Sequence, residues 1–166
     1  MKKILLLLFS ILFINAESKA QENEASDVCS RIERKVDEIE GEIQLNSPLI
    51  NGSALSSLII YKDIKNGKAV YYLSLKTRGS TVVVDGKGAT ILFTDGTKLK
   101  KEEDIDVDSD ESGFKYSAFI TLTPADLVTF STKKIKMFRL YIFDKIVSPE
   151  DSEEFTAYVS CIKKQK

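Results

Sequence analysis

The chain has 166 residues, carries 24 basic against 25 acidic side chains, and contains no histidine. The absence of histidine excludes the Ser-His-Asp and Cys-His catalytic arrangements and the histidine-containing zinc sites. A net charge of −1 provides no field that would attract nucleic acid or anionic lipid, and the sequence holds no glycine-rich phosphate-binding loop. We therefore expect no cofactor and no nucleic-acid partner.

The first 20 residues have the pattern of a bacterial secretory signal peptide. A charged start at Lys2–Lys3 precedes the apolar run Ile4–Ile14, which is too short to span a bilayer. Two sites compete for cleavage, and we expect the cut after Ala20 rather than after Ala16. Residues 21–166 would then form one exported domain, periplasmic or secreted, with no membrane span. This mature chain has 21 basic and 24 acidic residues, so its net charge is −3.

Cys29 and Cys161 are the only two cysteines and lie near opposite ends of the mature chain. In an oxidising compartment two such thiols pair, and closing so long a loop is worth about 5 kcal/mol in the chain-entropy model. A redox or nucleophilic pair would instead need close Cys-x-x-Cys spacing or a histidine, and the chain has neither. We therefore predict a structural disulfide that ties both ends to a domain large enough to have its own core.

The N-terminal part of the mature chain carries two overlapping patterns. Apolar residues recur at helical spacing from Val28 to Ile39, which predicts a short helix beginning near Asp27. Apolar residues then alternate as far as Leu45, which predicts a strand from about Ile39 onwards. Residues 46–56 are rich in serine and asparagine and include a proline, so we expect a loop there.

From residue 57 onwards the chain reads as strands separated by turn signals. Asn66–Gly67 is the dipeptide preferred in two-residue type I′ hairpins, and Arg78–Gly79, the segment 85–88 and Asp95–Gly96 mark further turns. Successive turns of this kind predict an antiparallel meander. The strands predicted on this basis are Ser57–Lys62, Ala69–Lys76, Thr81–Val84, Ala89–Phe93, Lys98–Lys100 and Phe114–Leu122.

Two helix starts stand out in the last third of the chain. Thr123 precedes a proline and predicts a short helix over Pro124–Phe130, and Ser148 followed by Pro149 and acidic residues predicts a C-terminal helix. Between them, Lys133–Phe143 is apolar on both faces and is predicted to be a central strand that is covered on both sides. The stripe that the C-terminal helix would bury consists of Phe155, Tyr158, Val159 and Ile162.

These elements predict a mainly β domain. We expect an antiparallel β-sandwich or curved sheet of six to eight strands with the C-terminal helix packed on it. The alternative is an α+β arrangement with the helices on one face.

The one acidic cluster lies between Glu102 and Glu111. Its alternating aspartates resemble the start of a calcium loop, but glutamate stands where the loop needs glycine, and serine where it needs a bidentate acid. We therefore expect a solvated loop or an edge strand protected by like charges, with a weak calcium site as the alternative. The candidate ligands are Asp104, Asp106, Asp108 and Asp110.

Two further groups are candidates for partner binding. Tyrosines in strands could line a binding face, although such residues usually serve packing. A basic strand could meet an acidic partner, although a charged solvent face explains it as well. The tyrosines are Tyr71, Tyr72 and Tyr141, and the basic residues are Lys133, Lys134, Lys136 and Arg139.

Because no reactive centre is recognisable, the sequence favours a non-enzymatic exported protein that binds another protein or a cell-envelope component. Two alternatives stay open: a hydrolase that uses only carboxylates, drawn from Asp104–Glu111, and a structural envelope component. A concave pocket holding two inward-facing acids would favour the enzyme, and a flat exposed apolar patch would favour partner binding.

Overall fold

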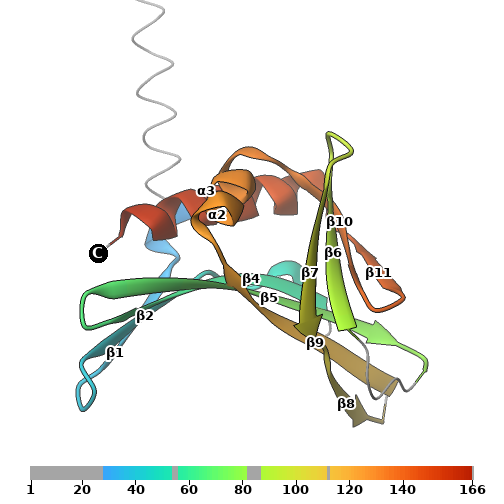
Figure 1. Cartoon of the computed structure of the whole chain (residues 1–166), viewed down its shortest axis with the longest axis horizontal. Helices are drawn as coiled ribbons and strands as arrows, with labels where there is room; N and C mark the ends of the chain where they lie inside the picture. The colour runs from blue at the N-terminus through green and yellow to red at the C-terminus, as the bar shows by residue number, and fades with distance from the viewer. Residues whose placement is uncertain (1–27, 54–55, 82–86, 112, 166) are drawn as a thin grey trace, which may run out of the picture.

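The computed structural model describes residues 28–53, 56–81, 87–111 and 113–165, most of them in two antiparallel sheets. The predicted signal peptide and both of its cleavage sites lie outside these residues. Figure 1 shows the larger sheet below two helices, with the smaller sheet standing beside the helices on the same face. The fold is mainly β with a C-terminal helix against the larger sheet, which confirms the predicted fold class.

The larger sheet has seven strands in the order β1-β2-β4-β5-β9-β8, and β3 pairs with β4 beyond the end of β2. These strands are β1 (Glu33–Asp37), β2 (Glu42–Asn46), β3 (Ile50–Ser53), β4 (Ser56–Lys65), β5 (Lys68–Gly79), β8 (Asp106–Asp110) and β9 (Gly113–Leu122). The smaller sheet has the order β11-β10-β6-β7. Its strands are β6 (Lys87–Phe93), β7 (Lys98–Asp104), β10 (Ile135–Leu140) and β11 (Phe143–Ile146).

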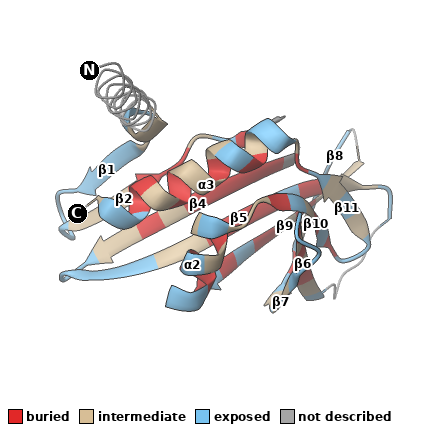
Figure 2. Ribbon diagram, turned by 90° about the horizontal axis from the view of Figure 1, so that it is seen from above, coloured by how far each residue is buried: buried red, intermediate tan, exposed pale blue. Residues whose placement is uncertain are grey.

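The core lies between the larger sheet on one side and α2 (Pro124–Thr132), α3 (Pro149–Lys164) and the smaller sheet on the other. Alternate residues of β4, β5 and β9 belong to it, and Figure 2 shows the buried stretches of these strands in red. The predicted stripe of α3 is fully buried there, and each such side chain contributes about 1.5–3 kcal/mol when removed from water. Neither described helix is long and apolar enough to cross a membrane.

Both helices begin where the sequence predicts. Thr123 accepts a hydrogen bond from the Asp126 backbone N–H, and the Asp126 carboxylate accepts one from the Thr123 backbone N–H, so α2 has a complete capping box. Ser148 accepts a hydrogen bond from the Asp151 backbone N–H at the start of α3. These caps satisfy backbone donors that a helix start otherwise leaves unpaired.

The predicted disulfide is present between Cys29 and Cys161, whose Cα atoms are 5.4 Å apart. Three hydrogen bonds fix the end of α3 close by. The side chain of Lys62, which is 5 % exposed, donates from Nζ to the carbonyl oxygens of Ile162 (3.4 Å) and Gln165 (2.5 Å). Gln165 Nε2 donates to the Cys29 carbonyl oxygen at 3.5 Å. The last turn of α3 is thus held to both β4 and the residues before β1.

The predicted helix from Asp27 to about Ile39 is wrong for most of its length. Among described residues only 28–30 are helical, and Glu33–Asp37 forms β1, which pairs with β2. The turn between them is closed by Asp37 Oδ1, which accepts from the Ile39 and Glu40 N–H groups, and by Gly41 at φ +68°. The pairing of β1 with β2 thus determines the local structure, although the apolar residues there are spaced as in a helix. The predicted loop 46–56 likewise contains the short strand β3.

The meander prediction is also wrong in its connectivity. The β4–β5 and β6–β7 hairpins form as expected, but β5 takes β9 as its second neighbour, and β6 pairs with β10 in the other sheet. Arg78 and Gly79 are the end of β5 rather than a turn, and most of the predicted strand Thr81–Val84 lies outside the described residues. Turn signals specify hairpin partners, whereas the remaining neighbours depend on packing of the whole chain.

The predicted strand Lys133–Phe143 is divided in two. Tyr141 adopts a positive φ of +55° and turns the chain, so that β10 and β11 form a hairpin. As predicted, β10 is an internal strand, flanked by β6 and β11. The prediction that it is covered on both faces is wrong, because Lys136 and Arg139 are exposed. The described residues form eleven strands in total, because short strands such as β1, β3, β8 and β11 add to the longer ones.

Candidate interaction surface

The face of the larger sheet opposite the helices is the most distinctive surface of the molecule. In Figure 1 no described helix or strand lies beneath this open face. Its centre carries the aromatic patch, which we define as Ile59, Tyr61, Val70, Tyr72 and Phe119. Phe119 is 52 % exposed and Val70 is 39 % exposed. The patch therefore presents apolar surface to solvent at the middle of a sheet.

The three rings of the aromatic patch pack against one another. Tyr61 and Tyr72 are directly opposite each other on β4 and β5, and Phe119 reaches them from β9. The Phe119 ring stacks on Tyr72 with centroids 4.9 Å apart and planes at 22°, and it lies 5.6 Å from Tyr61 at 53°. Partial burial raises the pKa of Tyr61 above its usual value, so its hydroxyl is neutral at physiological pH.

Charged and polar side chains surround the aromatic patch towards the β4–β5 turn. A depression next to Tyr72 and Val70 is lined by Glu42, Asp63 and Lys65. Lys65 forms ion pairs with Glu42 and with Glu40, and Asp63 Oδ1 accepts a hydrogen bond from Gln44 Nε2 at 3.1 Å. An apolar centre with a polar rim is the usual anatomy of a protein–protein interface.

The structure separates the three tyrosines proposed from the sequence. Tyr72 belongs to the aromatic patch, but its neighbour Tyr71 faces the helices and lies 5.4 Å from the Lys62 ammonium. Tyr141 lies in the β10–β11 turn of the other sheet. The sequence reasoning missed Tyr61 and Phe119, although the position of the Asn66–Gly67 turn already implies that Tyr61 pairs with Tyr72.

The acidic cluster divides between the two sheets. Asp104 ends β7 and pairs with Lys87 at 3.3 Å, whereas Asp106, Asp108 and Asp110 alternate along β8. Asp110 binds two cations, Arg78 and Lys115, each at 2.8 Å. The strand β8 is the edge of the larger sheet, which confirms the expected edge strand. Over the described ranges, no three acidic or cysteine side chains gather as metal ligands would.

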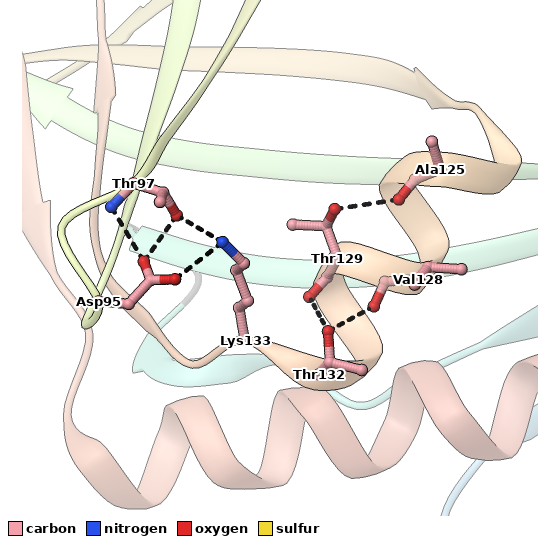
Figure 3. A network of polar contacts seen from close by, with 7 residues as sticks. All are labelled: Asp95, Thr97, Ala125, Val128, Thr129, Thr132 and Lys133. Carbon is pink, nitrogen blue, oxygen red and sulfur yellow. Dashed lines mark hydrogen bonds and ion pairs between the residues drawn. The ribbon is translucent and has the colours of Figure 1, made fainter.

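Most of the predicted basic strand is engaged in ion pairs within the fold. Figure 3 shows Lys133 between the end of α2 and the β6–β7 turn, where its Nζ contacts Asp95 Oδ2 at 2.8 Å and Thr97 Oγ1 at 2.9 Å. Lys134 pairs with Glu153 and Arg139 pairs with Asp144. These contacts leave little of the strand's charge for an acidic partner.

Among the described residues one carboxylate is buried, and it has a structural role. Asp126 is 6 % exposed and contacts the Lys101 ammonium at 2.6 Å while completing the α2 capping box. Burial alone would raise the pKa of Asp126, but hydrogen bonds from Lys101 and Thr123 outweigh it and lower the pKa. The carboxylate therefore links β7 to the start of α2 in its charged form.

No family model, curated protein or solved structure matches this chain.

Proposed function

We propose that the chain is an exported, non-enzymatic protein that binds a macromolecular partner, another protein or a cell-envelope component, through the aromatic patch. The observation that carries the proposal is a packed three-ring cluster at the centre of the open face, in which Phe119 is exposed and Tyr61 and Tyr72 are half-buried. Exposed apolar patches with a polar rim mark partner surfaces, and tyrosine is enriched among the residues that dominate binding energy.

The ring geometry favours a protein partner over a sugar. Tyr72 and Phe119 stack on each other, so each ring already uses one of its faces. A sugar-stacking platform needs ring faces directed at the ligand, whereas side chains of a protein can pack on ring edges as well. The partner surface should therefore be apolar at its centre and charged at its margin, to complement the Lys65 and Glu42 rim.

The proposed compartment is the periplasm or the cell exterior. The Cys29–Cys161 disulfide supports it, because such bonds persist in oxidising compartments and are rare in the cytosol.

The carboxylate-hydrolase alternative receives no support from the ionisation of the acidic groups. The pKa values of Asp37, Asp95, Asp126 and Asp144 are all lowered, chiefly through hydrogen bonds from neighbouring donors, but these acids lie outside Asp104–Glu111, the segment from which this alternative draws its acid and base. A general acid for glycoside cleavage needs the opposite shift. The structural-envelope alternative remains an outcome of the experiment below.

The proposal is tested by replacing Phe119 with serine. Immobilised mature protein should retain its partner from a cell-envelope extract of the native host, and Phe119→Ser should abolish that retention because the exposed ring is lost. The matched control is Val128→Ser, since Val128 is similarly exposed (57 %) but lies on α2. The readout is quantitative mass spectrometry of the retained proteins.

Equal retention by Phe119→Ser and the native chain would refute the proposal. Recovery of the chain's own copies alone, confirmed by sedimentation, would support the structural-component alternative instead.

A further inference from the structure

The strand β7 forms an edge of the smaller sheet. Its one neighbour in the described part of the chain is β6, and Figure 2 shows it at the rim of the molecule. Where the β6–β7 hairpin begins, the Phe93 N–H donates to the Thr97 carbonyl oxygen at 3.0 Å. Backbone groups alternate sides along an antiparallel strand, so Leu99 turns its N–H and C=O towards β6 and Lys100 turns them towards the free edge. Another strand can therefore pair there.

The exposed side chains of β7 carry an ordered pattern of charge. Exposure alternates along all seven residues of the strand, and the exposed ones are, in order, Lys98, Lys100, Glu102 and Asp104. The register against β6 shifts opposite Gly88, where β7 has one extra residue, but the alternation continues through this shift. One end of the exposed row is therefore positive and the other end is negative.

A second copy of β7 complements this pattern in one register. If two copies pair antiparallel with the two-fold axis at Lys101, position 100 of each lies opposite position 102 of the other, and position 98 lies opposite position 104. Every such pair joins a lysine to an acid, whereas parallel pairing in register would place like charges together. Opposite charges directly across a ladder contribute about 0.2–1 kcal/mol a pair, and like charges destabilise it.

The centre of this pairing is the one place where like charges would meet. Lys101 would lie opposite Lys101 of the other copy. The Lys101 side chain is 17 % exposed, however, and its ammonium already contacts the Asp126 carboxylate at 2.6 Å. The two-fold axis therefore brings together charges that are compensated within each chain.

The edge strand β8 provides a contrast within the same chain. Its exposed acids are Asp106, Asp108 and Asp110, so an antiparallel copy centred on Asp108 would bring acid against acid. Charges of one sign protect an edge, because they repel every copy of the strand. The charges of β7 have both signs in a fixed order, so they favour one partner strand in one register.

We propose that two copies of this chain associate through β7, with Lys100 of each opposite Glu102 of the other and Lys98 opposite Asp104. The two four-stranded sheets then form one continuous sheet of eight strands about a two-fold axis. This surface shares no residue with the aromatic patch, so the dimer does not depend on the partner proposed above.

The test is sedimentation equilibrium of the mature protein at low ionic strength. The native chain should form a dimer as its concentration rises, and added salt should weaken the dimer because exposed charges are screened. Lys100→Glu places acid opposite acid in two of the pairs, and we expect association to weaken about tenfold or more. The matched control is Lys100→Glu/Glu102→Lys, which has the native net charge and restores both pairs with reversed polarity. It should dimerise like the native chain.

Amide hydrogen exchange locates the interface. The Lys100 N–H should exchange more slowly as the protein concentration rises, because it gains a partner at the free edge. The Leu99 N–H already faces β6, so its exchange should not change. Phe119→Ser should dimerise like the native chain, which makes loss of the dimer and loss of partner retention separate results.

A sedimentation mass of a single chain at every concentration would overturn the proposal. Equal association of the native chain and Lys100→Glu would also overturn it, and so would a charge-swapped double variant that stays monomeric.

Discussion

At the scale of single residues, Gly79 shows how an absent side chain allows the two sheets to meet. A Cβ atom built on Gly79 would lie 2.3 Å from Cε2 and Cζ of Phe143, well inside van der Waals contact. The Phe143 ring comes from β11 of the smaller sheet and also lies 4.7 Å from the buried Tyr116 ring. The sequence pattern suggested a turn at this glycine, because a glycine needed for close approach looks the same as one needed for a turn.

We predict that Gly79→Ala lowers the free energy of unfolding by about 1–3 kcal/mol, because the methyl group must displace the Phe143 ring. The measurement is urea denaturation, alone and in a Phe143→Ala background. In that background the added methyl group meets no ring, so its cost should fall below about 1 kcal/mol. An equal cost in both backgrounds would show that the contact is not responsible.

At the scale of elements, local pairing was predictable and longer-range pairing was not. A two-residue turn at Asn66–Gly67 requires Tyr61 to face Tyr72, and the observed register has this pair. Two of the three rings of the aromatic patch therefore follow from one turn signal and simple counting. Phe119 lies more than forty residues later, and its place beside Tyr72 depends on β9 joining β5. No local signal specifies that neighbour.

Local signals also conflict at one element. Spacing from Val28 to Ile39 favoured a helix, yet Val36 is half exposed in β1 and pairs with Ile43. The apolar periodicity there does not correspond to a buried face. By contrast, the stripe of α3 is buried as predicted, because a cap, a proline and the periodicity all agree there.

The contact between the β6–β7 turn and the end of α2 should depend on pH. Hydrogen bonds from Lys133 and then from Thr97 lower the pKa of Asp95 to about 2. Because this folded-state pKa is below the unfolded value of about 3.9, the contact stabilises the fold above pH 4 and is lost as pH falls towards 2. NMR titration of the Asp95 carboxyl should show this midpoint. Lys133→Gln should move the midpoint upwards, and an unchanged midpoint would contradict the assignment.

At the scale of the whole molecule, the sequence predicted that a disulfide joins the two ends of the domain. It did not predict how the strands divide between the two sheets. Two cysteines in an exported chain have only one intramolecular pairing, so Cys29–Cys161 needed no structural knowledge. The division into two sheets depends on β9 pairing with β5 while β6 pairs with β10. Burial of the core that both sheets share decides this pairing.

The disulfide should account for a large part of the stability. It closes a loop with a sequence separation of 132 residues, so the double variant Cys29→Ser/Cys161→Ser should lose about 2–5 kcal/mol of unfolding free energy. Guanidinium denaturation with and without reductant provides the measurement. The reduced native chain should match the double variant. If reduction leaves the unfolding midpoint unchanged, the bridge contributes little.

The closeness of Cys29 to the end of α3 has a practical consequence for engineering. A short peptide linker from Gln165 to Val28 could replace the disulfide as the covalent connection between the two ends, since Gln165 already contacts the Cys29 carbonyl. New termini could be opened in the exposed turn between Ile39 and Glu40, which makes β1 the last strand of the rearranged chain. Such a circular permutant would keep every strand pairing and could be produced in a reducing cytoplasm.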